Sequence, residues 1–467
     1  MLDLLLINPP YFTPDELAAR RERFGGWIAG GNMYIHPFEP PLGLAALAAH
    51  LKGKGFRVEV LDLVGLGIPE EKLPEILRDK SPARVGIGAM TPLFPAARRL
   101  ARIVKQARPG TVVIVGGAHP TVSPETCLAE ENIDFIVRGE GEEVLAALLA
   151  GAAPEGIPGL LYKSPLPRGE GMKGRVKEQI VTPTLYLPPQ GGGAINDLDA
   201  LPLPDYDSFP VEKYVRYNES LRGLRGISML VSRGCPYQCS FCAVHLTMGR
   251  KFRIQSPARV VREMAGLQEK YSLEGIWFKD SILNLDPAWA GEFTAEIKKR
   301  GLKIKWQYNT RVDRIDEAEI RAEKAAGLVQ VDFGIESGSP RSLATLRKGI
   351  DLEKIKSAVR LAQKHVRVSG FFMIGIPGET REDIEMTFNL AQSLKLDKVC
   401  VSLYCPLPGS ALYDDLKKRE EYAGPLADLE KIHFTENPFS FCAVPAEKLR
   451  ELYGEINEFF SQKGDRS

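Results

Sequence analysis

The chain has 467 residues, enough for two or three domains with separate hydrophobic cores. Charged residues make up 26% and the formal net charge is +1, so no overall field draws the protein to nucleic acid or anionic lipid. Seven cysteines, an odd and sparse count, indicate a reducing compartment.

The N-terminal stretch MLDLLLINPPY has a short apolar run without a basic flank or a cleavage site, so we expect a strand and not a signal peptide. No run reaches the roughly 18 apolar residues that a membrane-spanning helix needs. We therefore expect a soluble, cytoplasmic protein without a membrane span or a nucleic-acid partner.

Residues 1–150 alternate apolar strands with helices. The predicted strands are Leu2–Ile7, Arg57–Leu63, Val85–Ala89, Val112–Val115 and Phe135–Val137, and the predicted helices are Pro41–Lys52 and Ala96–Ala107. This alternation predicts a doubly wound, Rossmann-like α/β domain that binds its ligand beyond the carboxyl ends of the strands.

Polar and glycine residues follow the third, fourth and fifth of these strands. Gly116 and Gly117 let backbone approach a ligand, and Thr91 and Thr121 can hydrogen-bond an amide or a phosphate. Glycines after strands are most often simple turns, so each signal is weak alone. The candidate ligand contacts are Thr91, Gly116, Gly117, His119, Thr121, Gly139 and Glu140.

The stretches PPLGLAALA, GGAHPT and GEGE together resemble a cobalamin-binding domain, and the resemblance covers residues 1 to about 149. It implies that the seven candidates contact cobalamin. The Asp-x-His-x-x-Gly motif that supplies a lower axial histidine to cobalt in many corrinoid proteins is absent. Of the nearby His36 and His119, we interpret His119 as a loop residue near the nucleotide tail and not as a cobalt ligand.

Residues 151–222 are rich in glycine, proline and aspartate and are predicted to be an interdomain linker. We expect one hairpin between Gly159–Tyr162 and Ile180–Thr184. The polar stretch Ser164–Val176 is predicted to be a mobile surface loop.

Three cysteines follow the predicted strand Ile227–Val231, with the spacing Cys235-x3-Cys239-x2-Cys242. Three thiolates this close can hold a four-iron four-sulfur (4Fe-4S) cluster by three irons and leave the fourth open for a substrate. A zinc site completed by His245, and unligated thiols, are the alternatives. Zinc ligands more often come from two separated pairs.

With Phe241 as the aromatic residue, the motif Cys-x3-Cys-x-aromatic-Cys resembles the signature of the radical S-adenosylmethionine (SAM) superfamily. A cobalamin-binding domain ahead of it is similar to the cobalamin-dependent subclass. The resemblance implies that the open iron chelates SAM and that an electron from a flavodoxin or ferredoxin type of donor cleaves SAM to a 5′-deoxyadenosyl radical.

Residues 223–415 resume the alternation of strands and helices, which predicts a (β/α)6 partial barrel with its site at the carboxyl ends of the strands. After Ile227–Val231, the predicted strands are Gly275–Lys279, Lys305–Asn309, Val331–Ile335, Ser369–Ile374 and Lys398–Leu403. The resemblance assigns SAM contacts to Phe241, Asp280, Arg311, Glu336, Ser337, Lys348, Gly375 and Ile376. A buried ion network of Asp280, Arg311 and Glu336 is the alternative.

Tyr404 and Cys405 follow the last strand and are candidate donors of a proton or hydrogen atom on the substrate side. Residues 416–467 are predicted to form a small helical cap, because Leu449, Leu452 and Ile456 recur at helical spacing. A partner-binding amphipathic helix is the alternative for this segment.

The resemblance as a whole implies an enzyme that methylates an unactivated carbon of a small molecule or peptide with methylcobalamin and a 5′-deoxyadenosyl radical. Ring closure or rearrangement without net methylation is the main alternative. A methylthiotransferase is disfavoured, because the N-terminal region holds only Cys127 and no basic C-terminal RNA-binding module is visible. A non-enzymatic corrinoid or iron-sulfur carrier is the remaining alternative.

Overall fold

The computed structural model describes residues 2–10, 39–163 and 194–464 and divides into two compact units. The described part of the first unit comprises residues 2–10, 39–163, 194–214 and 243–253. The described part of the second unit comprises residues 215–242 and 254–464. His36, the predicted loop Ser164–Val176 and the predicted strand Ile180–Thr184 lie outside the described residues.

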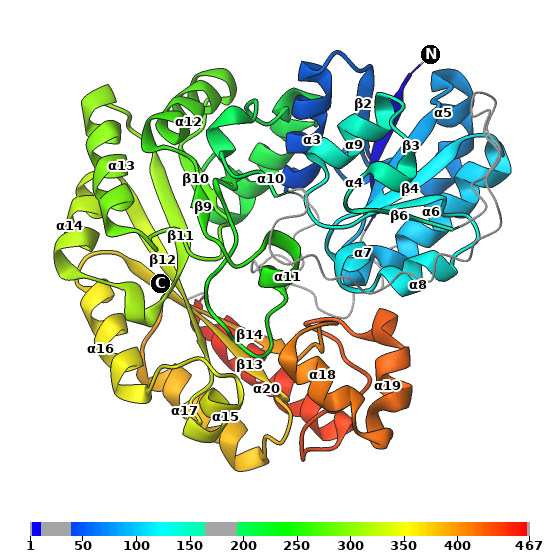
Figure 1. Cartoon of the computed structure of the whole chain (residues 1–467). Coiled ribbons are helices and arrows are strands. Elements are labelled where there is room, and N and C mark those ends of the chain that lie inside the picture. Colours follow the sequence, from blue (N-terminus) through cyan, green and yellow to red (C-terminus); the bar gives the residue numbers. More distant parts are fainter. Residues whose placement is uncertain (1, 11–38, 164–193, 465–467) are drawn as a thin grey trace. The chain divides into compact units, whose positions relative to one another are not determined.

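The first unit contains a six-stranded sheet in the order β2-β1-β3-β4-β5-β6 (Figure 1). The strands are β1 (Leu4–Asn8), β2 (Val58–Asp62), β3 (Arg84–Gly88), β4 (Val112–Gly116), β5 (Phe135–Val137) and β6 (Leu160–Tyr162). The helices are α3 (Leu42–Gly53), α4 (Leu63–Leu66), α5 (Leu73–Lys80), α6 (Phe94–Ala107), α7 (Ala118–Val122), α8 (Pro124–Ala129), α9 (Glu142–Leu149) and α11 (Val244–Met248). The first five strands are parallel, which confirms the predicted doubly wound domain.

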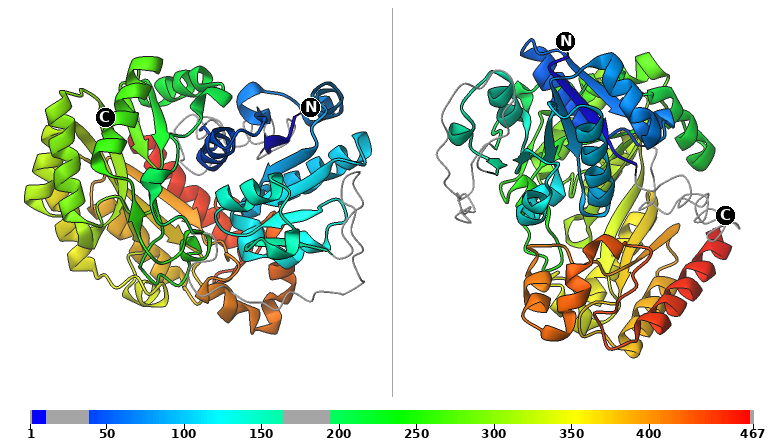
Figure 2. Two further views of the ribbon diagram at one scale, coloured as in Figure 1. Left: turned by 45° about the horizontal axis from the view of Figure 1, so that its top comes forward. Right: turned by 90° about the vertical axis from the view of Figure 1, so that its right-hand side faces the viewer.

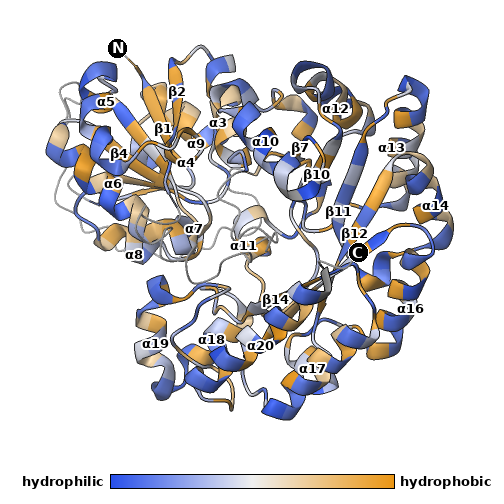
Figure 3. Ribbon diagram, turned by 180° about the vertical axis from the view of Figure 1, so that it is seen from behind, coloured by the Kyte–Doolittle hydropathy of each residue, from blue (hydrophilic) through white to orange (hydrophobic). Residues whose placement is uncertain are grey.

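Both faces of this sheet are buried, which explains the continuous apolar runs of its central strands. Leu5 and Ile7 of β1 belong to a hydrophobic core with Phe94 and Leu100 of α6. On the opposite face, Leu44 of α3 lies under β3. Figure 2 shows helices on both sides of the strands, and Figure 3 shows β1 and β2 in the hydrophobic colour.

The strand Leu160–Tyr162 forms as predicted, while its predicted hairpin partner Ile180–Thr184 lies outside the described residues, so the hairpin stays a prediction. Leu160–Tyr162 runs antiparallel to β5, with Ile136 opposite Leu161, and therefore extends the sheet of the first unit. Pairing with β5 satisfies backbone groups that an open sheet edge would leave without partners. Residues 194–214 of the predicted linker also belong to this unit, where Asp205 accepts a hydrogen bond from Lys52 at 2.6 Å.

The second unit is built on a curled sheet of six parallel strands in the order β14-β13-β12-β11-β10-β7. The strands are β7 (Gly226–Met229), β10 (Gly275–Phe278), β11 (Lys305–Arg311), β12 (Leu328–Glu336), β13 (Arg367–Ile374) and β14 (Lys398–Leu403), and two short strands, β8 (Ser232–Arg233) and β9 (Arg253–Ile254), lie outside this sheet. The helices that connect the sheet strands are α12 (Pro257–Tyr271), α13 (Pro287–Arg300), α14 (Glu317–Ala325), α15 (Pro340–Thr345), α16 (Leu352–Gln363) and α17 (Arg381–Ser393), and α10 (Val211–Arg222) precedes β7. The predicted (β/α)6 partial barrel is confirmed.

Local signals in the sequence set the ends of the barrel helices. Asp286 caps the N-terminus of α13 by accepting from the Ala288 N–H, and Gly301 ends the helix at a φ of 63°. Thr380 and Asp383 form a capping box at the start of α17. These caps fix where each helix leaves the carboxyl end of its preceding strand.

The C-terminal segment contains α18 (Ala411–Lys417), α19 (Ala423–Ala427) and α20 (Ala446–Gly464). Leu449, Leu452 and Ile456 of α20 are buried, and the helix contacts β14, so the predicted apolar stripe belongs to the protein core. No helix in the described part of the chain is long and apolar enough to cross a membrane.

Candidate active site

The loop with Cys235, Cys239 and Cys242 follows β8, and all three side chains are partly exposed free thiols. Asp280, at the carboxyl end of β10, holds the start of this segment. Its carboxylate accepts from the backbone N–H groups of Val231 and Ser232 at 3.1 and 2.5 Å, and from the Ser232 hydroxyl at 2.5 Å.

Asp280 is fully buried, and burial raises its pKa to about 6 although these hydrogen bonds act in the opposite direction. The geometry therefore gives Asp280 a supporting position behind the cysteine loop. Its predicted contact with SAM stays a prediction.

Ser240, between Cys239 and Cys242, ties the loop to the end of α15. Its N–H donates to the Leu346 carbonyl at 3.0 Å, and its hydroxyl donates to the Thr345 carbonyl at 2.7 Å. The Ser240 carbonyl accepts from the Leu412 N–H at 2.9 Å. These backbone contacts hold the loop between Asp280 on one side and α15 and α18 on the other.

Arg311 at the end of β11 lies beside a cysteine of the loop. Its Nη1 is 3.7 Å from the Sγ of Cys239, and the guanidinium lies 4.0 Å from the ring centroid of Tyr237. Asp313 accepts from Nε and Nη2 at 2.8 and 3.0 Å, while the Lys348 carbonyl accepts from Nη2 at 2.7 Å. The guanidinium is therefore held in one orientation, with a donor directed at the thiol.

The donor set fits a 4Fe-4S cluster, in which three irons each take one thiolate. Among the described residues, no three His, Cys, Asp or Glu side chains gather as a single metal ion requires. The positive charge of Arg311 beside Cys239 suits a cluster that gains an electron.

Three of the predicted SAM contacts lie together next to this loop. Lys348 Nζ is 2.8 Å from Glu336 Oε1 and 5.9 Å from the ring centroid of Phe241. Glu336 has a φ of 72°, which points to a constrained position at the end of β12. Gly334 makes room for the pair, since a Cβ there would lie 2.8 Å from Glu336 Oε1 and 2.9 Å from Lys348 Nζ.

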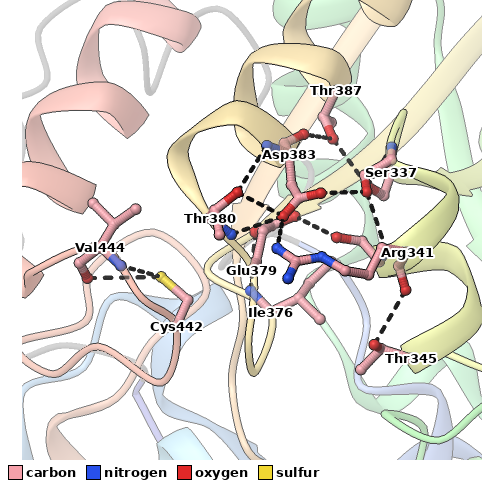
Figure 4. A network of polar contacts seen from close by, with 12 residues as sticks. Ser337, Arg341, Thr345, Ile376, Glu379, Thr380, Asp383, Thr387, Cys442 and Val444 are labelled. Carbon is pink, nitrogen blue, oxygen red and sulfur yellow. Dashed lines mark hydrogen bonds and ion pairs between the residues drawn. The ribbon is translucent and has the colours of Figure 1, made fainter.

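Ser337 lies in a different environment, shown in Figure 4. Its fully buried hydroxyl is 2.9 Å from that of Thr387 and accepts from the Ser339 N–H at 3.1 Å. This network continues through Ser339 to Asp383 at 2.6 Å. Ser337 thus supports the junction of β12 and α17, and its predicted contact with SAM stays a prediction.

Burial alone would raise the pKa of Asp383, the acceptor at the centre of this network. Hydrogen bonds from Arg341, Ser339 and Thr380 outweigh that effect and hold the pKa well below its ordinary value. Asp383 is therefore a carboxylate at neutral pH, and it fixes the N-terminus of α17.

Glu379 shapes the loop that carries the predicted SAM contacts Gly375 and Ile376, and no role was assigned to it from the sequence. Its Oε2 accepts from the N–H groups of Gly375 and Ile376 at 2.7 and 3.1 Å, and its Oε1 accepts from the Ser342 hydroxyl at 3.0 Å. Burial raises the pKa of Glu379 to about 7. The sequence does hold a signal for this role, because Glu379 stands directly after the Pro377-Gly378 turn and three residues after Ile376. The Ile376 side chain is fully buried.

Tyr404 and Cys405 follow β14 as predicted. Tyr404 is almost completely buried and packs edge-on to Phe441 with ring centroids 5.9 Å apart. Cys405 is partly exposed and lies in the same hydrophobic cluster as Phe241. Burial raises the pKa of both groups, so both carry their protons at neutral pH. Proton or hydrogen donation by either residue stays a prediction.

In the first unit, His119 lies in α7 and not in a loop, which corrects the expectation from the sequence. Its ring stacks on Phe94 with centroids 4.2 Å apart. Nδ1 is 3.3 Å from the Thr91 hydroxyl and Nε2 is 2.9 Å from the Thr126 hydroxyl. Burial first, and Arg98 second, lower the pKa of His119 to about 4, so the imidazole is neutral and both nitrogens have partners.

Thr121 joins the ends of β4 and β5. Its hydroxyl donates to the Gly117 carbonyl at 2.7 Å and accepts from the Gly139 N–H at 2.9 Å. Gly117 has a φ of 111°, and a Cβ there would lie 2.8 Å from the Ala89 carbonyl oxygen. Gly116 meets Val137 at an ordinary contact distance, whereas the space around Gly139 is open. The strand ends thus form one connected edge.

Glu140 pairs with Arg253, a residue to which the sequence assigned no role. The side chain of Arg253 is 5% exposed and that of Glu140 is 8% exposed. Arg253 Nη2 lies 2.5 Å from Glu140 Oε1. Glu140 Oε2 accepts from the Ile195 N–H at 2.9 Å. The carboxylate is therefore occupied by protein donors, and its predicted contact with cobalamin stays a prediction.

Comparisons with known proteins identify the family of each domain. Residues 34–149 match the family model described as B12 binding domain, and residues 229–391 match that of the radical SAM superfamily. The Pyrococcus horikoshii protein named "Uncharacterized methyltransferase PH0819" is 34% identical over 381 residues, which are 80% of this chain and 78% of that protein. The Rubrivivax gelatinosus protein named anaerobic magnesium-protoporphyrin IX monomethyl ester cyclase is 30% identical over 475 residues, which are 98% of this chain and 78% of that protein.

The fold is also found in a solved structure. The radical SAM methyltransferase TsrM from Kitasatospora setae, with cobalamin and a 4Fe-4S cluster bound, superposes with a TM-score of 0.69 at 22% identity. The alignment covers 90% of this chain and 75% of that chain. With its B12 binding domain, radical SAM domain and cysteine loop, this chain belongs to the cobalamin-dependent radical SAM enzymes, whose cofactors are cobalamin, a 4Fe-4S cluster and SAM.

Proposed function

We propose that the enzyme methylates an unactivated carbon of a small molecule or peptide and takes its electron from a flavodoxin or ferredoxin type of donor. The names of related proteins support methyl transfer, since the Pyrococcus horikoshii relative is named a methyltransferase. Bound together, the cofactors supply a carbon-centred radical and a transferable methyl group.

The observation that carries the proposal is the continuity between the cysteine loop and the B12 binding domain. The residues directly after Cys242 belong to the first unit, and α11 there contacts α7, which follows β4. One covalent segment therefore joins the radical-forming loop to the edge where a doubly wound domain binds its ligand. Such a connection suits a reaction in which the radical and the methyl group act on the same carbon.

The residues of the second unit have separate tasks in this reaction. Asp280 and Ser240 hold the cysteine loop, and Arg311 places a donor at Cys239. The Lys348–Glu336 pair provides one charge of each sign for the carboxylate and amino groups of SAM. Glu379 orders the Gly375–Ile376 backbone beside them.

Ring closure without methylation is the second candidate function. It is favoured by the Rubrivivax gelatinosus relative, which is named a cyclase and matches 98% of this chain. A cyclase would use the radical and the corrinoid without transferring a methyl group to its product.

The test needs no knowledge of the substrate. The full chain is reconstituted anaerobically with iron, sulfide and hydroxocobalamin, reduced with titanium(III) citrate, and given SAM with a trideuterated methyl group. We expect the extracted corrinoid to carry the labelled methyl group, with an equal amount of S-adenosylhomocysteine, as measured by mass spectrometry. Production of 5′-deoxyadenosine without any labelled corrinoid would reject methyl transfer and favour the cyclase.

A further inference from the structure

The segment 243–253, which directly follows the last cysteine of the cluster loop, is built into the cobalamin-binding unit. Its helix α11 contacts α7, and the two are seen side by side in Figure 1. The loop Cys235–Cys242 belongs to the other unit. The chain therefore leaves the cluster-binding loop and at once becomes part of the corrinoid domain.

Arg253 fastens the far end of this segment. Its Nη1 donates to the Ile195 carbonyl at 2.6 Å, and its Nη2 donates to Glu140 Oε1 at 2.5 Å and to the Met248 carbonyl at 2.7 Å. Met248 is the last residue of α11, whereas Glu140 follows β5. A single guanidinium thus joins α11, the connecting segment near Ile195 and a strand end at the predicted corrinoid edge.

A second set of contacts connects the same parts. Thr121 of α7 accepts from the Gly139 N–H at 2.9 Å, and its carbonyl accepts from Arg138 Nε at 3.3 Å. Since α11 contacts α7 and Arg253 binds Glu140, both ends of the segment 243–253 are attached to structures that follow β4 and β5. Ordering of these strand ends orders the segment as well.

We propose that Arg253 is a positioning residue that couples corrinoid binding to retention of the iron-sulfur cluster. A corrinoid at the carboxyl ends of β3–β5 restrains α7 and the Glu140 loop, and Arg253 passes this restraint to the residues attached to Cys242. Coupling between two ligands is reciprocal, so the cluster also strengthens corrinoid binding. The proposal requires that the chain binds both cofactors, and it is independent of whether the enzyme transfers methyl groups.

The experiment measures iron release from the reconstituted full chain to bathophenanthroline disulfonate under anaerobic conditions, with and without hydroxocobalamin. Coupling free energies commonly change affinity by about fivefold or more. We expect hydroxocobalamin to slow iron release by at least about fivefold in the wild-type chain. In Arg253→Met the ratio of the two rates should fall to about one, whatever the absolute rates are.

Two further variants keep the test decisive if Arg253→Met fails to fold. Arg253→Lys keeps the charge, but one ammonium cannot reproduce the planar fork that spans three acceptors, so the ratio should fall there too. Glu140→Gln turns an amide donor toward the Ile195 N–H or toward Arg253 and should act in the same direction. Lower chain stability alone would speed iron release equally with and without hydroxocobalamin and leave the ratio unchanged.

Lys105→Met is the matched control. Lys105 forms a largely buried ion pair with Asp134 at 2.5 Å in the same unit, beside the first residues of β4 and β5 and so away from the carboxyl ends. In Lys105→Met the ratio of the iron-release rates without and with hydroxocobalamin should equal that of the wild type. An absence of corrinoid protection in the wild type, or full protection in Arg253→Met or Arg253→Lys, would overturn the proposal. If the chain shows this coupling but forms no labelled methyl corrinoid from SAM, the proposed methyltransferase activity is rejected and the role of Arg253 stands.

Discussion

The Nη1 of Arg311 lies 3.7 Å from the Sγ of Cys239. Asp313, the Lys348 carbonyl and the Tyr237 ring hold the guanidinium in this orientation. An N–H donor and a positive charge at a cluster sulfur stabilise the reduced, more negative form of the cluster. This contact therefore bears on how readily the enzyme accepts its electron.

We predict that Arg311→Met lowers the reduction potential of the cluster. The measurement is a redox titration of the reconstituted protein, followed by electron paramagnetic resonance of the reduced cluster. Arg314→Met is the control, because Arg314 donates to the Tyr237 hydroxyl at 2.7 Å and, among the described residues, has no hydrogen bond to a cysteine. Equal potentials for the wild type and Arg311→Met would show that the contact does not tune the cluster.

Asp280→Asn should reduce the amount of iron that the chain retains after reconstitution. The amide replaces a charged acceptor by a neutral one and turns an NH2 group toward the Val231 N–H, which lies 3.4 Å from Oδ2. The bonds that hold the cysteine loop therefore weaken at a cost of about 1–3 kcal/mol. Iron and sulfide per chain give the readout.

The control for this variant is Asp316→Asn, which alters an aspartate that caps α14 through the Ala318 and Glu319 N–H groups. Asn caps a helix about as well as Asp, so this variant should change stability little and retain its iron. If both variants retained iron like the wild type, Asp280 would not be a support of the cluster loop.

Glu379→Gln should change thermal stability in a pH-dependent way. Burial raises the pKa of Glu379 to about 7, above the value of 4.5 for an unfolded chain. A raised carboxyl pKa gives stability that is fully present below pH 4.5 and is lost as the pH rises through 7. This pH-dependent contribution of Glu379 to the free energy of unfolding amounts to at most about 3 kcal/mol.

Glutamine does not titrate, so the melting temperature of Glu379→Gln relative to the wild type should rise between pH 5 and pH 8. Comparison of the two midpoints across this range tests the sign. A constant difference would mean that Glu379 does not titrate with the raised pKa.

His119 should not ligate cobalt. Both ring nitrogens have hydroxyl partners and the ring stacks on Phe94, so ligation would require several contacts to break. Electron paramagnetic resonance of the cob(II)alamin-loaded chain should be the same for the wild type and His119→Gln. Thr126→Val, which removes one partner of the ring, serves as a control. Nitrogen superhyperfine splitting that disappears in His119→Gln would identify the imidazole as an axial ligand.

The fold class, the family and its cofactors could be predicted from the sequence because their signals are local. Apolar runs separated by helical patterns predicted both parallel sheets, and the spacing of Cys235, Cys239 and Cys242 carried the family resemblance. The resemblance and its cofactors are confirmed by the matched family models. Strand ends also indicated where the polar residues of each domain gather, because parallel strands end at one edge.

The tasks of individual side chains were decided only by the tertiary structure. The Asp280 carboxylate accepts from a backbone N–H 48 residues earlier, Glu140 pairs with Arg253 across 113 residues, and β6 adds an antiparallel edge strand next to β5. Each case depends on which buried donors and acceptors meet once distant segments pack together. The sequence alone determined that a radical-forming loop and a corrinoid domain share one chain. Packing decided that Arg253 binds Glu140 and the carbonyl groups of Ile195 and Met248, because a buried guanidinium needs acceptors that only folding brings near it.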